Sequence, residues 1–208
     1  DGLKSRVDLM YTYDCGEAEK YGIHFFNAPI YSKLLPVQKT AQFAYDLLFV
    51  GYAKDRLAEL LALQTYLTQN KVRCCFRIVG VPQAQRRSGD GLFYESAPMP
   101  YAQIVELIRQ SRCILELTQT NSQGATMRTQ EAIAYQRKLL SNREGLLQEP
   151  YCKPQQMRVF NQPENVDISF LLSPIPYDET VQDVNLSPMQ EIDFLEQLLT
   201  QEAQQHGT

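Results

Sequence analysis

The feature that most constrains the fold is a regular alternation of short apolar runs with amphipathic helical patterns. Five runs have the length and composition of buried strands: 46–50, 73–79, 113–117, 138–141 and 157–160. A shorter run at 92–94 is a further candidate strand. Helical patterns lie between the runs, at 55–69, 101–111 and 126–136. Strands that alternate with helices predict an α/β fold, here a Rossmann-like doubly wound parallel sheet with helices on both faces.

The segment before this region carries a smaller set of elements. We expect strands at 7–13 and 24–26, joined by a short helix that Asp14 caps and Gly22 ends. Residues 27–44 contain two prolines and predict a connection.

At the other end, Ser187 opens the sequence S-P-M-Q, a capping-box start for a final amphipathic helix. The predicted organisation therefore has three parts. Residues 1–44 are the remnant of a preceding domain with its linker, 45–186 the Rossmann-like domain, and 187–208 the C-terminal helix and tail.

Composition excludes several classes of function. The 208 residues carry a net charge of −4 with acids and bases mixed, so we expect no nucleic-acid binding. No apolar run reaches the length of a membrane span, and no secretory leader is visible, which favours a cytoplasmic protein. The five cysteines form no C-x-x-C pair, and only two histidines occur, so we expect neither a metal site nor a Ser-His-Asp triad.

Ligands of open parallel sheets bind outside the carboxyl ends of the strands. The first candidate there is GYAKDR, residues 51–56. Gly51 permits a tight turn, while Lys54 and Arg56 offer cations to a phosphate. An ordinary turn with solvated charges fits the same residues.

The second candidate is the segment SQGATMRTQE, residues 122–131. Gly124 lets the backbone approach a ligand, and the N–H groups that follow lie at a helix N-terminus, where anions bind. These groups belong to Ala125, Thr126 and Met127. Arg128 adds a positive charge that opposes the helix dipole unless an anion such as a diphosphate compensates it. The alternative is a surface arginine beside a weak helix cap.

Glu131 lies one turn beyond Arg128 on the same side of the helix. Its carboxylate can accept hydrogen bonds from both hydroxyls of a ribose, or it can form a surface pair with Arg128. The chain contains neither G-x-G-x-x-G nor G-x-x-x-x-G-K-[ST]. These absences argue against an NAD dehydrogenase and a P-loop NTPase.

Residues 123–142, QGATMRTQEAIAYQRKLLSN, resemble a segment of the C-terminal domain of GT-B glycosyltransferases. In that family an acidic residue stands eight positions before a glutamate that opens a helix written like EAMA. Glu131 and the following AIA match the second half, whereas Gln123 replaces the first acid, so no role that needs a charge there carries over. The opening VDLMYTYD…EAEKYGIHFF…APIY resembles the end of the acceptor-side domain, and the variant looks most like bacterial enzymes of capsule or lipopolysaccharide assembly.

The resemblance implies that the chain binds a nucleotide-sugar donor for transfer to a polysaccharide or lipopolysaccharide acceptor. Glu131 would hold the ribose. The groups around the diphosphate would be Lys54, Arg56, Thr126 and Arg128. The base would lie near Tyr101 and the 96–100 loop. It also implies no metal and no cofactor, because cations and the helix dipole stabilise the leaving diphosphate. It names no catalytic residue.

Further expectations follow from the resemblance. The acceptor would be a glycan or a lipid-linked glycan, and the absent domain would make any peripheral membrane contact. This chain alone would bind the donor but transfer sugar poorly, and an apolar surface around 7–31 would favour self-association. Two other classes stay open: a non-catalytic Rossmann-like module for nucleotide or protein binding, and a receiver domain. The second fits less well, because Gly51-Tyr52-Ala53 stands where a receiver carries acids.

Overall fold

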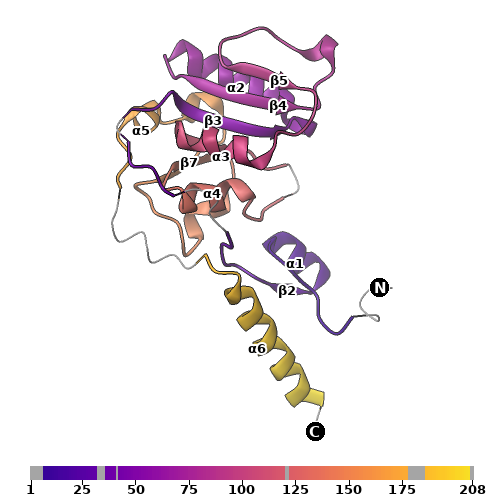
Figure 1. Cartoon of the computed structure of the whole chain (residues 1–208). Coiled ribbons are helices and arrows are strands. Elements are labelled where there is room, and N and C mark those ends of the chain that lie inside the picture. Colours follow the sequence, from indigo (N-terminus) through magenta and orange to yellow (C-terminus); the bar gives the residue numbers. More distant parts are fainter. Residues whose placement is uncertain (1–6, 32–35, 41, 120–121, 178–185, 207–208) are drawn as a thin grey trace.

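The computed structural model describes residues 7–31, 36–40, 42–119, 122–177 and 186–206. Its centre is a six-stranded sheet in which every pair of neighbours is parallel (Figure 1). In chain order the strands are β3 (Tyr45–Tyr52), β4 (Cys74–Val79), β5 (Leu92–Glu95), β6 (Ser111–Glu116), β7 (Lys138–Ser141) and β8 (Met157–Val159). Their spatial order is β5-β4-β3-β6-β7-β8. The five expected strands and the candidate at 92–94 are confirmed, and the fold is the predicted Rossmann-like α/β sheet.

Helices cover both faces of the sheet. They are α2 (Leu57–Gln69), α3 (Tyr101–Arg109), α4 (Met127–Ala134) and the short α5 (Ile168–Leu172). One apolar core joins α2 and α5 to the sheet, and a second joins α3 and α4 to its other face. Along β3, Leu47 and Phe49 belong to the first core, while Leu48 and Val50 belong to the second. Burial on both faces explains why residues 47–50 of β3 are all apolar instead of alternating.

A smaller unit precedes the sheet. It consists of β1 (Tyr11–Thr12), α1 (Cys15–Tyr21) and β2 (His24–Phe25), with β1 and β2 paired in parallel. The strand expected over 7–13 is too long, because β2 offers only two pairing partners. Asp14 caps α1 and Gly22 ends it in the left-handed region at φ 58°, both as predicted.

The final helix α6 (Met189–His206) packs on this small unit and not on the sheet (Figure 1). Phe194 contacts the rings of Phe26 and Tyr11, with centroids 5.1 and 6.0 Å away. Among the helices of the described ranges, none has both the length and the apolar character of a membrane span.

Three predicted helix boundaries were wrong. The first helix of the main region is preceded by a 3-10 turn at Lys54–Arg56, so α2 starts only at Leu57. The helix expected to reach residue 111 ends at Arg109, because Ser111 already belongs to β6. The helix expected to reach residue 136 ends at Ala134, since Gln136 adopts a left-handed φ of 50°. The domain borders after residues 44 and 186 stay predictions.

Candidate functional site

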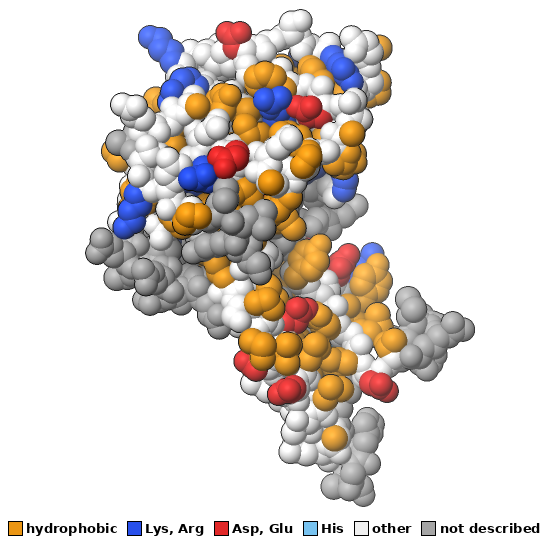
Figure 2. Space-filling model, in the orientation of Figure 1, with side chains coloured by type: hydrophobic (Ala, Val, Ile, Leu, Met, Phe, Trp, Pro, Cys, Tyr) orange, Lys and Arg blue, Asp and Glu red, His pale blue; other side chains and the backbone are white. Residues whose placement is uncertain are grey.

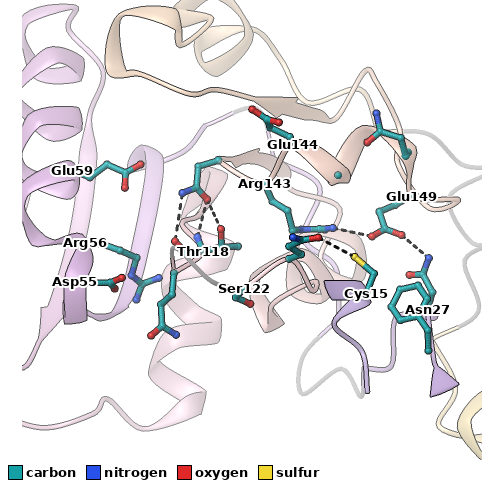
Figure 3. Close-up of a pocket in the computed structure, with 16 residues that line it drawn as sticks. Cys15, Asn27, Asp55, Arg56, Glu59, Thr118, Ser122, Arg143, Glu144 and Glu149 are labelled. Atoms are coloured by element: carbon teal, nitrogen blue, oxygen red, sulfur yellow. Dashed lines mark hydrogen bonds and ion pairs between the residues drawn. The ribbon is translucent and has the colours of Figure 1, made fainter. Parts of the chain in front are cut away.

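The strand order reverses between β3 and β6, since chain succession runs outward from β3 on one side and from β6 on the other. Such a reversal opens a crevice at the carboxyl ends of the two strands. A pocket of about 820 Å³ lies there (Figure 3). Segments that follow β3, β6 and β7 form most of its lining, and two residues of the small N-terminal unit and one just after it also line it.

The wall after β3 carries Arg56 between two acids, Asp55 and Glu59. The Arg56 guanidinium donates to the backbone carbonyls of Leu117 and Tyr52, the latter at 2.7 Å. These bonds orient the guanidinium without cancelling its charge. Burial lowers the pKa of Arg56 and raises the pKa of the Glu59 carboxyl. The wall therefore presents one fixed cation and two carboxylates.

The floor of the pocket is formed where β6 and β7 end. Asn142 joins the two strand ends, because its Oδ1 accepts hydrogen bonds from the Thr118 N–H at 2.8 Å and from the Thr118 hydroxyl at 3.0 Å. Both residues line the pocket. The floor thus offers a fixed carboxamide and a fixed hydroxyl.

Arg143 lines the same floor and is only 4% exposed. Its guanidinium donates to Glu149 at 2.9 Å and lies 3.5 Å from the carboxylate of Glu116. Burial alone would lower the pKa of Arg143, but Glu116, Tyr151 and Glu149 raise it above its usual value. The sequence interpretation missed this cation. It directly follows the strand run KLLS and its Asn, so the strand-end rule applied to Arg56 would have found it.

The helix N-terminus that was expected to bind an anion faces a carboxylate of the chain itself. Glu116 is fully buried, and its Oε1 accepts from the Thr126 N–H at 2.9 Å and from the hydroxyls of Thr126 and Thr129 at 2.8 and 2.7 Å. Its Oε2 accepts from the Ser141 hydroxyl at 2.7 Å. The Thr126 hydroxyl in turn caps α4 by accepting from the Arg128 N–H at 3.1 Å.

Gly124 serves a close approach, but its neighbour is another part of the chain. A Cβ at this position would lie 2.8 Å from the Tyr13 carbonyl oxygen, and the Gly124 N–H donates to Asp14 at 2.9 Å. We expected Gly124 to let the protein backbone approach a ligand, and this expectation needs correction. It makes room for the segment that leads into α1.

Glu131, Arg128 and Tyr101 form a cluster of their own. Glu131 is fully buried, 2.5 Å from the Arg128 guanidinium, and it accepts from the Tyr101 hydroxyl at 3.0 Å. The Tyr101 hydroxyl also shares a hydrogen bond with Tyr31. Burial raises the pKa of Glu131, while Arg128 and Tyr101 oppose the rise. The carboxylate is buried and the Arg128 side chain is 17% exposed, so this is not a surface pair. One carboxylate oxygen accepts from Tyr101, and the other makes the ion pair with Arg128 but no hydrogen bond.

The far side of the pocket is closed by Cys15 and Phe25 of the small N-terminal unit and by Asn27, two residues after β2. Asn27 donates to Glu149 at 2.7 Å, so a chain of bonds runs from Arg143 through Glu149 to this unit (Figure 3). Two of the ten predicted site residues line the pocket, Arg56 and Gln123. The other eight do not: Gly51, Lys54, Tyr101, Gly124, Ala125, Thr126, Arg128 and Glu131. Their role in ligand binding stays a prediction.

Within the described ranges, no group of three or more His, Cys, Asp and Glu side chains is arranged to hold a metal ion. No protein-family model and no curated protein matches the chain. One solved structure that matches is the crystal structure of T4 phage BGT in complex with its UDP-glucose substrate, with 11% identity and a TM-score of 0.46. The match covers 73% of this chain and 45% of that chain, so the present chain spans less than half of that protein's length. At this identity the similarity concerns the fold alone.

Proposed function

We propose that this chain is the donor-binding part of a glycosyltransferase and that the pocket between β3, β6 and β7 holds a nucleotide-sugar. The observation that carries the proposal is the pocket itself. It lies at the reversal point of a Rossmann-like sheet and combines two arginines with a lining of amides, hydroxyls and carboxylates. A cavity of about 820 Å³ falls within the range of about 300–1,000 Å³ that is typical of ligand sites.

The lining suggests where the diphosphate, the ribose and the sugar of a donor would each lie in the pocket. Four carboxylates and two guanidinium groups line it, so a diphosphate is favourable only beside the arginines. Arg56 is the better partner, because its hydrogen bonds go to neutral carbonyls even though Asp55 and Glu59 flank it. Arg143 is instead bonded to Glu149 and lies 3.5 Å from the Glu116 carboxylate. Carboxylates accept hydrogen bonds only, which suits the hydroxyls of ribose and of the sugar.

In catalysis, Arg56 would stabilise the negative charge that develops on the departing diphosphate. The finer assignment to capsule or lipopolysaccharide assembly rests on the resemblance of residues 123–142 alone. A glycan or lipid-linked acceptor and a cytoplasmic location belong to that same assignment. They remain part of the proposal.

The test is calorimetric titration of the chain with UDP-glucose, GDP-mannose and dTDP-glucose, each beside its free nucleoside. We expect one nucleotide-sugar to bind, and Arg56→Ala to weaken it by about 1.5–3 kcal/mol, the usual loss for hydrogen bonds to a charged group. The nucleoside should lose little affinity in this variant, since it lacks the diphosphate.

Arg86→Ala is the matched control. Arg86 also donates to a backbone carbonyl, that of Val81 at 3.0 Å, but it does not line the pocket. Its variant should bind as the unaltered chain does. Failure of all three nucleotide-sugars to bind, or equal losses in the two arginine variants, would contradict the proposal.

A further inference from the structure

The N-terminus of α1 and the loop before α4 are held together at the edge of the pocket by hydrogen bonds to one carboxylate. One oxygen of Asp14, Oδ1, accepts from the N–H groups of Gly16 and Glu17 at 2.9 and 3.1 Å. Its other oxygen, Oδ2, accepts from the N–H groups of Gln123 and Gly124 at 2.7 and 2.9 Å. A single carboxylate thus caps a helix and binds a loop that lies about a hundred residues further along the chain.

A further hydrogen bond and the burial of Asp14 strengthen this link. The Ser122 hydroxyl donates to Oδ2 at 3.3 Å, and Asp14 is only 5% exposed. Burial alone would raise the pKa of Asp14, but the bonds from Gly124, Gln123, Glu17 and Ser122 lower it below its usual value. Asp14 is therefore a charged group whose partners are all protein donors. The bonds to charged groups are the strong ones.

The loop that Asp14 holds carries two pocket residues, Ser122 and Gln123. The Gln123 side chain is exposed, and its carboxamide lies against the start of α1. The Cys15 thiol lies 3.6 Å from its Oε1, and a Cβ on Gly16 would lie 3.2 Å from its Cδ. Gly16 thus leaves the space in which the Gln123 side chain lies, and Asp14 fixes the backbone that carries it.

We infer that Asp14 is a positioning residue for ligand binding: it acts through Ser122 and Gln123, from outside the sheet that forms most of the pocket. The inference rests on the proposed function, because it needs a ligand in this pocket. Asp14 itself does not line the pocket. The Asp14 carboxylate holds the loop backbone in place, and the Gln123 carboxamide and the Ser122 hydroxyl therefore keep the orientation in which they bind the ligand.

Two variants test the inference by calorimetry with the nucleotide-sugar that binds best among UDP-glucose, GDP-mannose and dTDP-glucose. In Asp14→Asn, the side-chain oxygen still caps α1, but an NH₂ group replaces the acceptor of the Gln123 and Gly124 N–H groups. We expect affinity to fall about tenfold, the lower end of the loss seen when residues that orient metal ligands are replaced. Amide hydrogen exchange at Gln123 and Gly124 should quicken in the same variant.

Gly16→Ala separates positioning from stability. Alanine favours a helix over glycine, so the melting temperature should hold or rise. The new Cβ would lie 3.2 Å from the Gln123 Cδ, so this side chain must shift by a few tenths of an ångström, which should weaken binding. A purely structural role would move stability and affinity in the same direction. The matched control is Asp167→Asn, which alters the aspartate cap of α5 away from the pocket. It should leave affinity unchanged.

Unchanged affinity in both Asp14→Asn and Gly16→Ala, with the unaltered chain binding its ligand, would overturn the inference and leave the proposed function standing. Loss of affinity in Asp167→Asn equal to that in Asp14→Asn would also overturn it, since the effect would then follow from stability. If the unaltered chain binds none of the three nucleotide-sugars, the proposed function fails and this inference fails with it.

Discussion

Three almost fully buried carboxylates organise the end of the sheet where ligands are expected: Asp14, Glu116 and Glu131. Glu116 accepts from the Thr126 N–H, one of the three backbone groups that the sequence assigned to a bound anion, and Glu131 pairs with Arg128. Asp14 accepts from the neighbouring N–H groups of Gln123 and Gly124. The sequence identified the α4 N-terminus as a place where a negative charge is stabilised, but it could not name the carboxylate that lies there. Asp14 lies 110 residues before Gly124, and no local pattern reports a contact over that separation.

The Glu131 and Arg128 pair yields a prediction at this scale. Glu131→Ala leaves the Arg128 guanidinium without its carboxylate, and breaking a buried pair costs about 3–5 kcal/mol of unfolding free energy. We expect a cooperative urea transition at a clearly lower midpoint. Replacing both residues by methionine should recover much of the loss, because a buried apolar pair needs no charge compensation.

The same two variants decide the role that the sequence assigned to Glu131. If Glu131 holds a ribose, the double methionine variant recovers stability but not nucleotide affinity. If the double methionine variant recovers both stability and nucleotide affinity, the pair is structural. An alanine variant as stable as the unaltered chain would show that the pair contributes nothing to folding.

At the scale of elements, the sequence predicts the sheet well. Strands β3, β4 and β6 each contain an apolar run that is buried on both faces of the sheet, so their identity depends little on tertiary context. The sequence predicts the ends of helices and strands, and the very short elements, less well. Helix α5 has five residues, too few for a periodic pattern, and the sequence interpretation missed it.

Helix α5 and strand β7 are joined by a buried lysine. The Lys138 ammonium donates to the carbonyl oxygens of Phe170 and Ser173 and, at 2.7 Å, to the Ser173 hydroxyl. Burial lowers the pKa of Lys138 to about 8. The lysine satisfies the carboxyl end of a helix that has no basic residue in its own last turn.

Lys138 yields a pH prediction. The folded chain loses this proton near pH 8, whereas an unfolded lysine keeps it to about pH 10.4. Between these values the unfolded state binds more protons, so the free energy of unfolding should rise with pH. Urea titrations at pH 7.5, 8.5 and 9.5 should show a more positive slope for the unaltered chain than for Lys138→Met. Identical slopes in the two proteins would contradict the shifted pKa.

At the scale of the whole molecule, the chain has two packing centres. The larger is the six-stranded sheet with its helices, and the smaller joins α6 to the β1-α1-β2 unit. Apolar side chains are exposed over the smaller one, as Figure 2 shows, and they include Tyr11, Phe25, Ile192 and Leu199. The expected apolar surface around residues 7–31 is therefore present, and self-association through it stays a prediction.

The last prediction concerns the independence of the two centres. Phe194 packs on Phe26 and Tyr11 but on no residue of the sheet's two cores. Phe194→Ala should therefore loosen α6 and the small unit while the sheet keeps its stability, because stability differs between parts of a structure that share few contacts. Hydrogen exchange measured segment by segment should quicken across α6 and stay unchanged in β3 to β7. Leu199→Ala, at an exposed apolar position of the same helix, controls for lost helix hydrophobicity and should change neither. Faster exchange in the central strands of Phe194→Ala would mean that the centres unfold together, and that the Asp14 link and the Asn27–Glu149 bond join them into one cooperative unit.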